Sequence, residues 1–160
     1  MAGFFIYLEF KEIIMNKKIL LSILSFVFVG FTYSQSYNIE GDWYNEEKDA
    51  IIKIYKESDG TFSGKITWMK FPNNENGKPK TDPLNDDESL RSRSRMGMKI
   101  MYDFTYDGDD EWDDGEIYDP KSGNTYRGTI NIVSKNRLNL RGYVGISWFG
   151  RTSHWTRKTK

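Results

Sequence analysis

The side chains most capable of binding or catalysis lie in two charged stretches, and the first is a run of alternating arginines. Arg91, Arg93 and Arg95 occupy every second position. Guanidinium groups bind carboxylate or phosphate through paired hydrogen bonds, so this triplet is a candidate anion-binding site. The alternative is pairing with acidic side chains of the same region, which is the commoner outcome for a charge run. Those acidic residues are Asp82, Asp86, Asp87 and Glu88.

The second stretch is the acidic run from Asp107 to Asp114. Calcium takes six to eight oxygen ligands, so the run is a candidate cation site. Its spacing differs from the twelve-residue calcium loop, because Trp112 stands at the sixth position, where that loop requires glycine. The run is therefore interpreted as a solvated connector rather than a metal site.

Histidine and cysteine, the usual ligands of transition metals, are almost missing from the chain. His154 is the single histidine, and there is no cysteine. This set cannot build a typical zinc or copper site. No Gly-rich phosphate loop and no Gly-x-Ser-x-Gly elbow occurs either. The sequence thus predicts a protein that is not an enzyme and has no metal, cofactor or catalytic residue. An enzyme remains the weaker alternative, built from the acidic run and Arg141.

The first 34 residues read as a secretory signal peptide. Met15-Asn16-Lys17-Lys18 is a short basic start, an apolar run follows from residue 19 to 29, and small residues precede Gln35. The apolar run is shorter than the roughly 20 residues of a membrane span, although a retained anchor helix is the alternative. Residues 1–14 carry two glutamates, which signal starts seldom contain, so Met15 is the predicted true start.

Residues 35–160 are then a single domain, exported to the periplasm or the extracellular space. Removal of residues 1–34 leaves a net charge of about −1, which provides no overall attraction for nucleic acid. Stability must come from the core, since no disulfide is possible. We expect no stable membrane insertion after cleavage of the signal, and the sequence identifies no protein partner.

The domain is predicted to be all-β. Residues 112–126 form a hairpin around the turn Asp119-Pro120-Lys121-Ser122-Gly123, where proline and glycine suit the two corners. A second hairpin turns at Ser58-Asp59-Gly60. Period-two alternation recurs along the rest of the chain and predicts about eight strands. Because sequential strands usually pair, we expect an antiparallel up-and-down meander closing into a lipocalin-like β-barrel. Residues 72–89 form a long polar loop.

Several landmarks together resemble a family of small secreted bacterial proteins. They are Gly41-Asp-Trp43, Leu90-Arg91-Ser-Arg93, Gly115-Glu-Ile117-Tyr118-Asp119-Pro120, Leu140-Arg141-Gly142-Tyr143 and Trp155-Thr-Arg157. The ordered set resembles domain-of-unknown-function family 2147 (DUF2147) from about residue 39 to 157. The resemblance implies an exported all-β domain and no assigned activity. The chain departs from that family's Asn-Pro-Asp run, since Asn85-Asp86-Asp87 stands in its place.

A looser similarity links the chain to the calycin barrels, which include lipocalins and fatty-acid-binding proteins. These also begin with Gly-x-Trp, and a basic residue near the chain end packs over the tryptophan. The similarity implies that Trp43 and Arg157 play those structural parts, and as a likeness of fold it says little about function.

The abundant aromatic side chains leave two functions open. Either they line a cavity for a small apolar or amphiphilic ligand, or they fill the barrel of a structural or protein-interaction module of the envelope. The binding module is the first hypothesis, with the 72–89 loop near the cavity mouth. Its candidate ligand-binding residues are Trp68, Tyr102, Phe104, Tyr126, Ile130 and Arg141.

Overall fold

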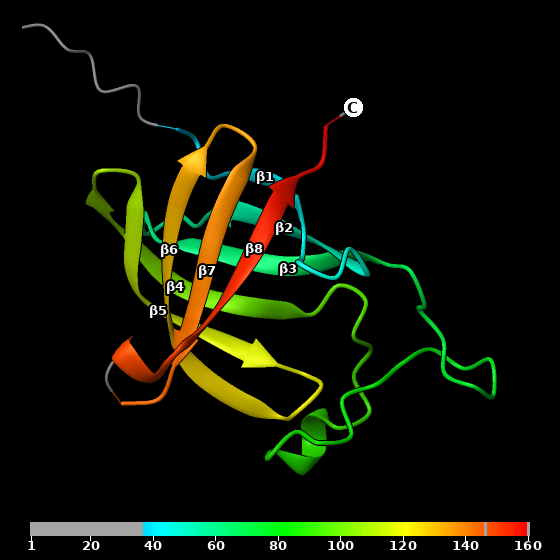
Figure 1. Ribbon diagram of the computed structural model, residues 1–160. Coiled ribbons are helices and arrows are strands. Elements are labelled where there is room, and N and C mark those ends of the chain that lie inside the picture. Colours follow the sequence, from blue (N-terminus) through cyan, green and yellow to red (C-terminus); the bar gives the residue numbers. More distant parts are fainter. Residues whose placement is uncertain (1–36, 146, 160) are drawn as a thin grey trace, which may run out of the picture. The chain divides into compact units, whose positions relative to one another are not determined.

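Each strand of the protein pairs with the next along the chain, and the last pairs with the first (Figure 1). The computed structural model describes residues 37–145 and 147–159, which belong to one compact unit spanning residues 36–160. The strands are β1 Gly41–Tyr44, β2 Ala50–Lys56, β3 Phe62–Met69, β4 Lys99–Gly108, β5 Glu111–Asp119, β6 Asn124–Ser134, β7 Arg137–Tyr143 and β8 Arg151–Arg157. Two single-turn 3-10 helices, η1 Glu88–Leu90 and η2 Ser147–Phe149, lie in the connections.

This closed antiparallel meander of eight strands confirms the predicted all-β barrel. The predicted signal peptide and start site, residues 1–34, lie outside the described residues. Within the described part of the chain, no helix is long and apolar enough to cross a membrane.

Both predicted hairpins are present. In the turn between β5 and β6, the Gly123 amide donates to the Asp119 carbonyl at 2.8 Å, and Gly123 has a φ of +77°, which glycine adopts without strain. Between β2 and β3, the Glu57 amide donates to the Thr61 carbonyl at 2.8 Å, and Gly60 has a φ of +96°. The local turn chemistry therefore sets the register of these strands.

Alternate connections of a meander lie at the same end of the barrel, so each end has its own set of connections. We call one end the open end; its connections are residues 45–49, 70–98, 120–123 and 144–150. At the opposite, closed end lie residues 57–61, 109–110, 135–136 and the entering segment 37–40.

The closed end is fastened by Trp43 and Arg157. The Arg157 guanidinium carbon lies 4.0 Å from the centre of the Trp43 ring, and Trp43 itself is fully buried. The Trp43 indole donates to the Ile39 carbonyl at 2.8 Å, while Arg157 donates to the carbonyls of Glu40 and Lys135. Burial lowers the pKa of Arg157, whose charge is compensated by these carbonyls and by the ring face. Arg157 therefore joins β8 to the entering segment, to β1 and to the β6–β7 turn.

Part of the barrel interior is filled by Phe104. Its ring is fully buried, and it packs against two glycines of neighbouring strands, Gly115 on β5 and Gly128 on β6. A Cβ atom at Gly115 would overlap the Phe104 ring, and one at Gly128 would lie 2.8 Å from Phe104 Cζ. Glycine at these two paired positions thus leaves room for the Phe104 ring over β5 and β6.

The 70–98 connection is held by a buried carboxylate. Asp82 is fully buried and accepts hydrogen bonds from Tyr118 at 2.6 Å, from Asn85 at 2.9 Å and from Arg93 at 3.0 Å. Burial alone would raise the pKa of Asp82, but the bonds from Tyr118, Asn85 and Arg93 outweigh it and hold that pKa below its ordinary value. Burial, followed by the bond to Asp82, raises the pKa of the Tyr118 hydroxyl. The long polar loop is therefore anchored to β5 at the open end.

Replacing Gly115 by alanine should destabilise the fold. The added methyl overlaps the Phe104 ring, so we expect a loss of about 1–3 kcal/mol in the free energy of unfolding. Gly142→Ala is the matched control, since its Cβ would meet Tyr126 at 3.6 Å, an ordinary contact. Urea unfolding followed by tryptophan fluorescence measures both, and equal losses would contradict the account of Phe104.

Asp82→Asn should lower the free energy of unfolding by an amount that depends on pH. Because its pKa is lowered by folding, ionised Asp82 stabilises the native state above the ordinary carboxyl pKa of about 4, and this contribution is lost as the pH falls through the lowered value. We expect a loss of about 1–3 kcal/mol near neutral pH that shrinks in acid. The control is Asp86→Asn, an exposed change in the same loop. A penalty that is the same at every pH would refute the role of the charge.

Candidate ligand-binding cavity

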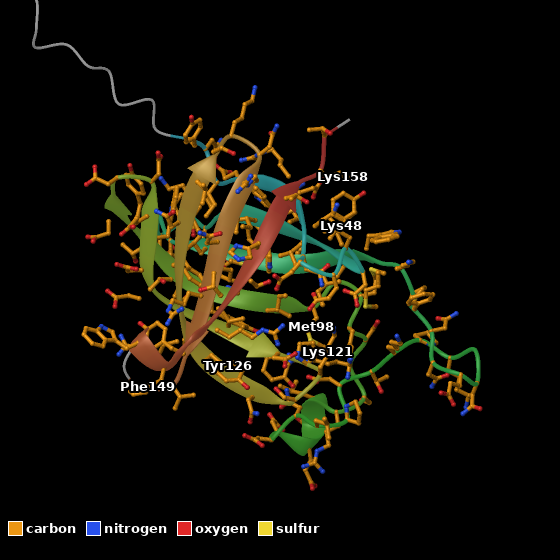
Figure 2. The ribbon with its side chains drawn as sticks, in the orientation of Figure 1. Lys48, Met98, Lys121, Tyr126, Phe149 and Lys158 are labelled. Carbon is orange, nitrogen blue, oxygen red and sulfur yellow. The ribbon has the colours of Figure 1, made fainter. Side chains whose placement is uncertain are left out.

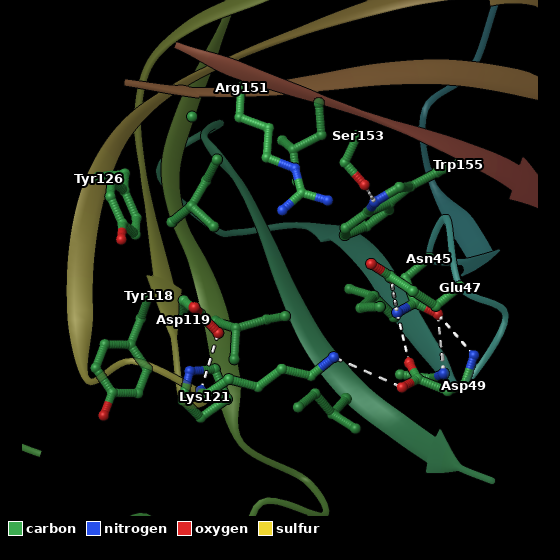
Figure 3. A pocket seen from close by; sticks show the side chains of 18 of the residues that line it. Asn45, Glu47, Asp49, Tyr118, Asp119, Lys121, Tyr126, Arg151, Ser153 and Trp155 are labelled. Carbon is green, nitrogen blue, oxygen red and sulfur yellow. Dashed lines mark hydrogen bonds and ion pairs between the residues drawn. The ribbon is translucent and has the colours of Figure 1, made fainter. Parts of the chain in front are cut away.

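A cavity of about 530 Å³ opens at the end of the barrel opposite Trp43 and Arg157. Figure 3 shows part of its lining. Its inner wall is apolar, and its outer part is polar. The apolar wall includes Ala50, Ile52, Ile66, Met69, Ile100, Ile117, Leu140 and Trp155. The polar part includes Asn45, Glu47, Asp49, Lys80, Arg95, Asp119, Lys121, Arg151 and Ser153. This is the composition of a site that receives an apolar body and recognises a polar group.

All four connections of the open end contribute to the mouth. Lys80 and Arg95 come from the 70–98 loop, and Lys121 lies in the β5–β6 turn (Figure 2). Val144 and Phe149 come from the connection before β8 and are strongly exposed, at 72% and 82%. The prediction that the long loop stands near the cavity mouth agrees with this placement.

The inward residues of β8 follow a regular alternation. Arg151, Ser153 and Trp155 line the cavity, whereas the residues between them do not. The Trp155 indole donates to the Ser153 hydroxyl oxygen at 2.9 Å. Arg151 is exposed at the start of the strand and Trp155 is buried further along it, so the strand leads from the mouth into the apolar interior.

The carboxylates of the mouth are engaged by neighbours. Asp49 lies 3.6 Å from the Lys121 ammonium and accepts from Asn45 at 2.6 Å. Asn45 also donates to Glu47 at 2.9 Å. Asp119 accepts from the Lys121 amide and the Ser122 hydroxyl, which completes its own turn. These contacts stabilise the connections around the mouth.

Of the six residues predicted to bind a ligand, Tyr126 lines this cavity. Phe104 and Ile130 do not line it, because both are packed into the filled part of the barrel, with exposures of 0% and 1%. This corrects their expected role. Their large apolar side chains close the interior instead of bordering a space.

Trp68 points to the other face of the sheet. Ile52 pairs with Ile66, but the preceding Ile51 pairs with Trp68, so β3 carries one extra residue. Such a bulge reverses the side-chain alternation beyond it. Trp68 is 39% exposed and makes an edge contact with Tyr44, at 6.3 Å between ring centres. The expectation that it lines the cavity is corrected accordingly.

Tyr102 is displaced by a second irregularity. Met101 pairs with Gly64, and Phe104 pairs with Phe62, so three steps on β4 oppose two on β3. Asp103, within this stretch, has a φ of +59°. Tyr102 therefore does not share a face with Phe104; it donates to the Lys99 carbonyl at 2.7 Å and borders a separate pocket of about 260 Å³.

Arg141 is likewise outside the cavity wall. It donates to the Thr152 hydroxyl at 3.0 Å and to the Trp148 carbonyl at 3.2 Å. It thus supports the connection before β8 rather than a bound molecule. His154 lies within hydrogen-bonding distance of Asn139, at 2.7 Å on the neighbouring strand.

The three arginines of the 90–95 region are not gathered into one site. Arg91 pairs with Glu88 at 2.9 Å and Arg93 with the buried Asp82 at 2.9 Å. Arg95 donates to the carbonyls of Thr81 and Pro120 and lines the cavity mouth. Two of the three therefore follow the alternative of pairing with local carboxylates, and Arg95 is the one directed at the cavity.

The acidic run spans the end of β4, the β4–β5 turn and the start of β5 at the closed end. Asp110 accepts from the Tyr37 amide at 2.8 Å, and Asp114 lies 3.4 Å from Arg127. Burial, followed by the charges of Asp107 and Asp114, raises the pKa of Asp113. Among the described residues, no group of three or more His, Cys, Asp or Glu side chains is arranged to hold a metal ion.

Most of the cavity wall could not be recognised in the sequence. Alternation places Ile66 on the inward face of its strand but does not indicate a cavity there. Arg151 and Ser153 are not among the predicted site residues, although period-two spacing over residues 151–155 puts them on one face with Trp155. No local signal indicates that Lys80 and Lys121, far apart in the chain, meet at one mouth.

Comparison with solved structures finds a protein of similar fold. Protein HP1028 from Helicobacter pylori, described as belonging to the lipocalin family, superposes with a TM-score of 0.67 and 22% sequence identity. The match covers 78% of this chain and 85% of that protein. None of the curated proteins compared with this chain matches it.

A family model described as "Uncharacterized protein conserved in bacteria (DUF2147)" matches residues 41–157, from the start of β1 to the end of β8. The chain is a lipocalin-like β-barrel and belongs to the DUF2147 family.

Proposed function

We propose that the protein binds a small apolar or amphiphilic molecule in the cell envelope after export, without catalysing a reaction on it. The observation that carries the proposal is the cavity of about 530 Å³ at the open end. Sites for small molecules commonly measure about 300–1,000 Å³ and combine apolar walls with a few polar groups. The isoleucine wall and polar mouth have this composition.

The distribution of packing supports binding over a purely structural barrel. A module with a filled barrel would have bulky side chains along the whole interior, whereas here Phe104 and Ile130 fill one part and the cavity occupies another. Gly142 lies on the cavity wall, and a Cβ atom added to it would lie 3.6 Å or more from its nearest neighbours, so this position leaves space. The fold of HP1028 is consistent with this interpretation as an analogy of architecture.

A catalytic role has less support from the geometry. The enzyme alternative requires the acidic run and Arg141 to act together. Asp113, whose pKa is raised, and Arg141 both lie outside the wall of the cavity. The carboxylates that do line it are engaged by Asn45, Lys121 and Ser122.

Filling the cavity should weaken binding while the fold persists. Gly142→Leu extends a side chain past Tyr126 and Ile117 into the space, so we expect at least a roughly tenfold loss of affinity for the neutral probe N-phenyl-1-naphthylamine. Fluorescence enhancement measures probe affinity. Gly142→Ala is the control and should bind nearly as the unaltered protein does.

Native mass spectrometry of the protein purified gently from its own host provides the complementary measurement. A reproducible small molecule that is lost on unfolding supports the proposal. A clean apo mass together with no probe uptake by the unaltered protein would contradict it and would favour a structural or interaction role.

A further inference from the structure

The cavity mouth contains a cation that has no partner among the residues the structure describes. Arg151 begins β8, and its side chain projects into the cavity between Tyr126 and Trp155 (Figure 3). Within residues 37–145 and 147–159, no group accepts a hydrogen bond from the Arg151 guanidinium or forms an ion pair with it. Its neighbour across the sheet is Gly142, which has no side chain to cover it.

The other charged groups of the mouth do not compensate Arg151. Lys121 is directed at Asp49, and the Asp119 carboxylate completes its own turn. Arg95 is held by two main-chain carbonyls, which carry no negative charge. Among the described residues, four cationic side chains and three carboxylates line the cavity, so the mouth has a surplus of positive charge.

This charge stands beside an apolar chamber. Ile52, Ile66 and Leu140 are buried on the wall below it. A guanidinium presents a planar fork of donors that matches a carboxylate through two parallel hydrogen bonds. Ser153, two residues further in, accepts from Trp155, and its hydroxyl group can also donate a hydrogen bond.

We propose that the ligand is a single-chain amphiphile with a carboxylate head, whose tail occupies the isoleucine chamber and whose head is bound at the mouth by Arg151. Ser153 is the second head-group residue. This inference rests on the proposed function and adds the chemical class of the ligand and its orientation, with the head at the mouth. A phosphate head would offer similar oxygens, so the test separates the two.

The experiment is displacement of N-phenyl-1-naphthylamine from the unaltered protein at about pH 8, where a carboxylic acid is ionised. Competitors of equal chain length are hexadecanoic acid, hexadecanol and hexadecyl phosphate. We expect the acid to displace the probe at a concentration at least roughly tenfold lower than the alcohol. Among the described residues the cavity lining has a surplus of one positive charge, which a singly charged carboxylate neutralises and a doubly charged phosphate exceeds, so we expect the phosphate to require a higher concentration than the acid. Equal potency of acid and alcohol would overturn the head-group assignment, and a more potent phosphate would overturn the carboxylate.

Variants of Arg151 then test whether this residue recognises the head group of the ligand. Arg151→Gln should raise the concentration of acid required and should not raise that of the alcohol, so that the preference for the acid falls by roughly tenfold or more, while Arg151→Lys restores part of the preference. Arg137→Gln, an exposed change at the closed end, is the matched control and should alter neither. An undiminished acid preference in Arg151→Gln would refute the role of Arg151. Failure of the unaltered protein to take up the neutral probe would instead refute the proposed function itself.

Discussion

The contact between the Arg157 guanidinium and the Trp43 ring is the interaction on which the closed barrel depends. The first and last strands are in register at two residue pairs only, Trp43 with Arg157 and Tyr44 with Thr156. So short a ladder contributes few hydrogen bonds. Arg157 compensates because it also donates to the carbonyls of Glu40 and Lys135, which belong to the entering segment and to the β6–β7 turn. A single side chain thus joins the seam to two further segments while it stacks on a buried indole.

Because the closed end of the barrel is held together by Trp43 and Arg157, the open end can contain a cavity. Phe104 fills the interior over the paired Gly115 and Gly128, so that part of the barrel is stabilised by close packing. The opposite part can then remain hollow, since its connections are held individually: Asp82 anchors the long loop, and Asn45 and Lys121 engage the acids of the connection before β2. Stability and cavity are separated along the barrel axis.

Local patterns predicted the architecture and failed to predict the wall of the cavity. Turn residues such as Gly60 and Gly123 act over a few positions, and alternation repeats along each strand, so the eight-stranded meander followed from the sequence. The face of the sheet on which a side chain lies is harder to predict, because one extra residue in a strand reverses the alternation beyond it. The irregularity before Trp68 turns that ring outward, and the one at Asp103 separates Tyr102 from Phe104. Both depend on pairing with a neighbouring strand, which is not encoded in either strand alone.

The position of Arg151, which has no acid partner among the described residues, has a physical consequence for any molecule that enters. While the cavity is open, water solvates the guanidinium and it costs little. A ligand that covers the mouth removes that water, and an uncompensated charge in an apolar setting is expensive. A wholly apolar ligand would therefore gain contact with Ile52 and Ile66 and lose part of that gain at Arg151. A ligand with an anion at the same depth avoids this loss and adds charge-assisted hydrogen bonds. Selectivity then arises as much from the penalty on the wrong head group as from attraction of the right one.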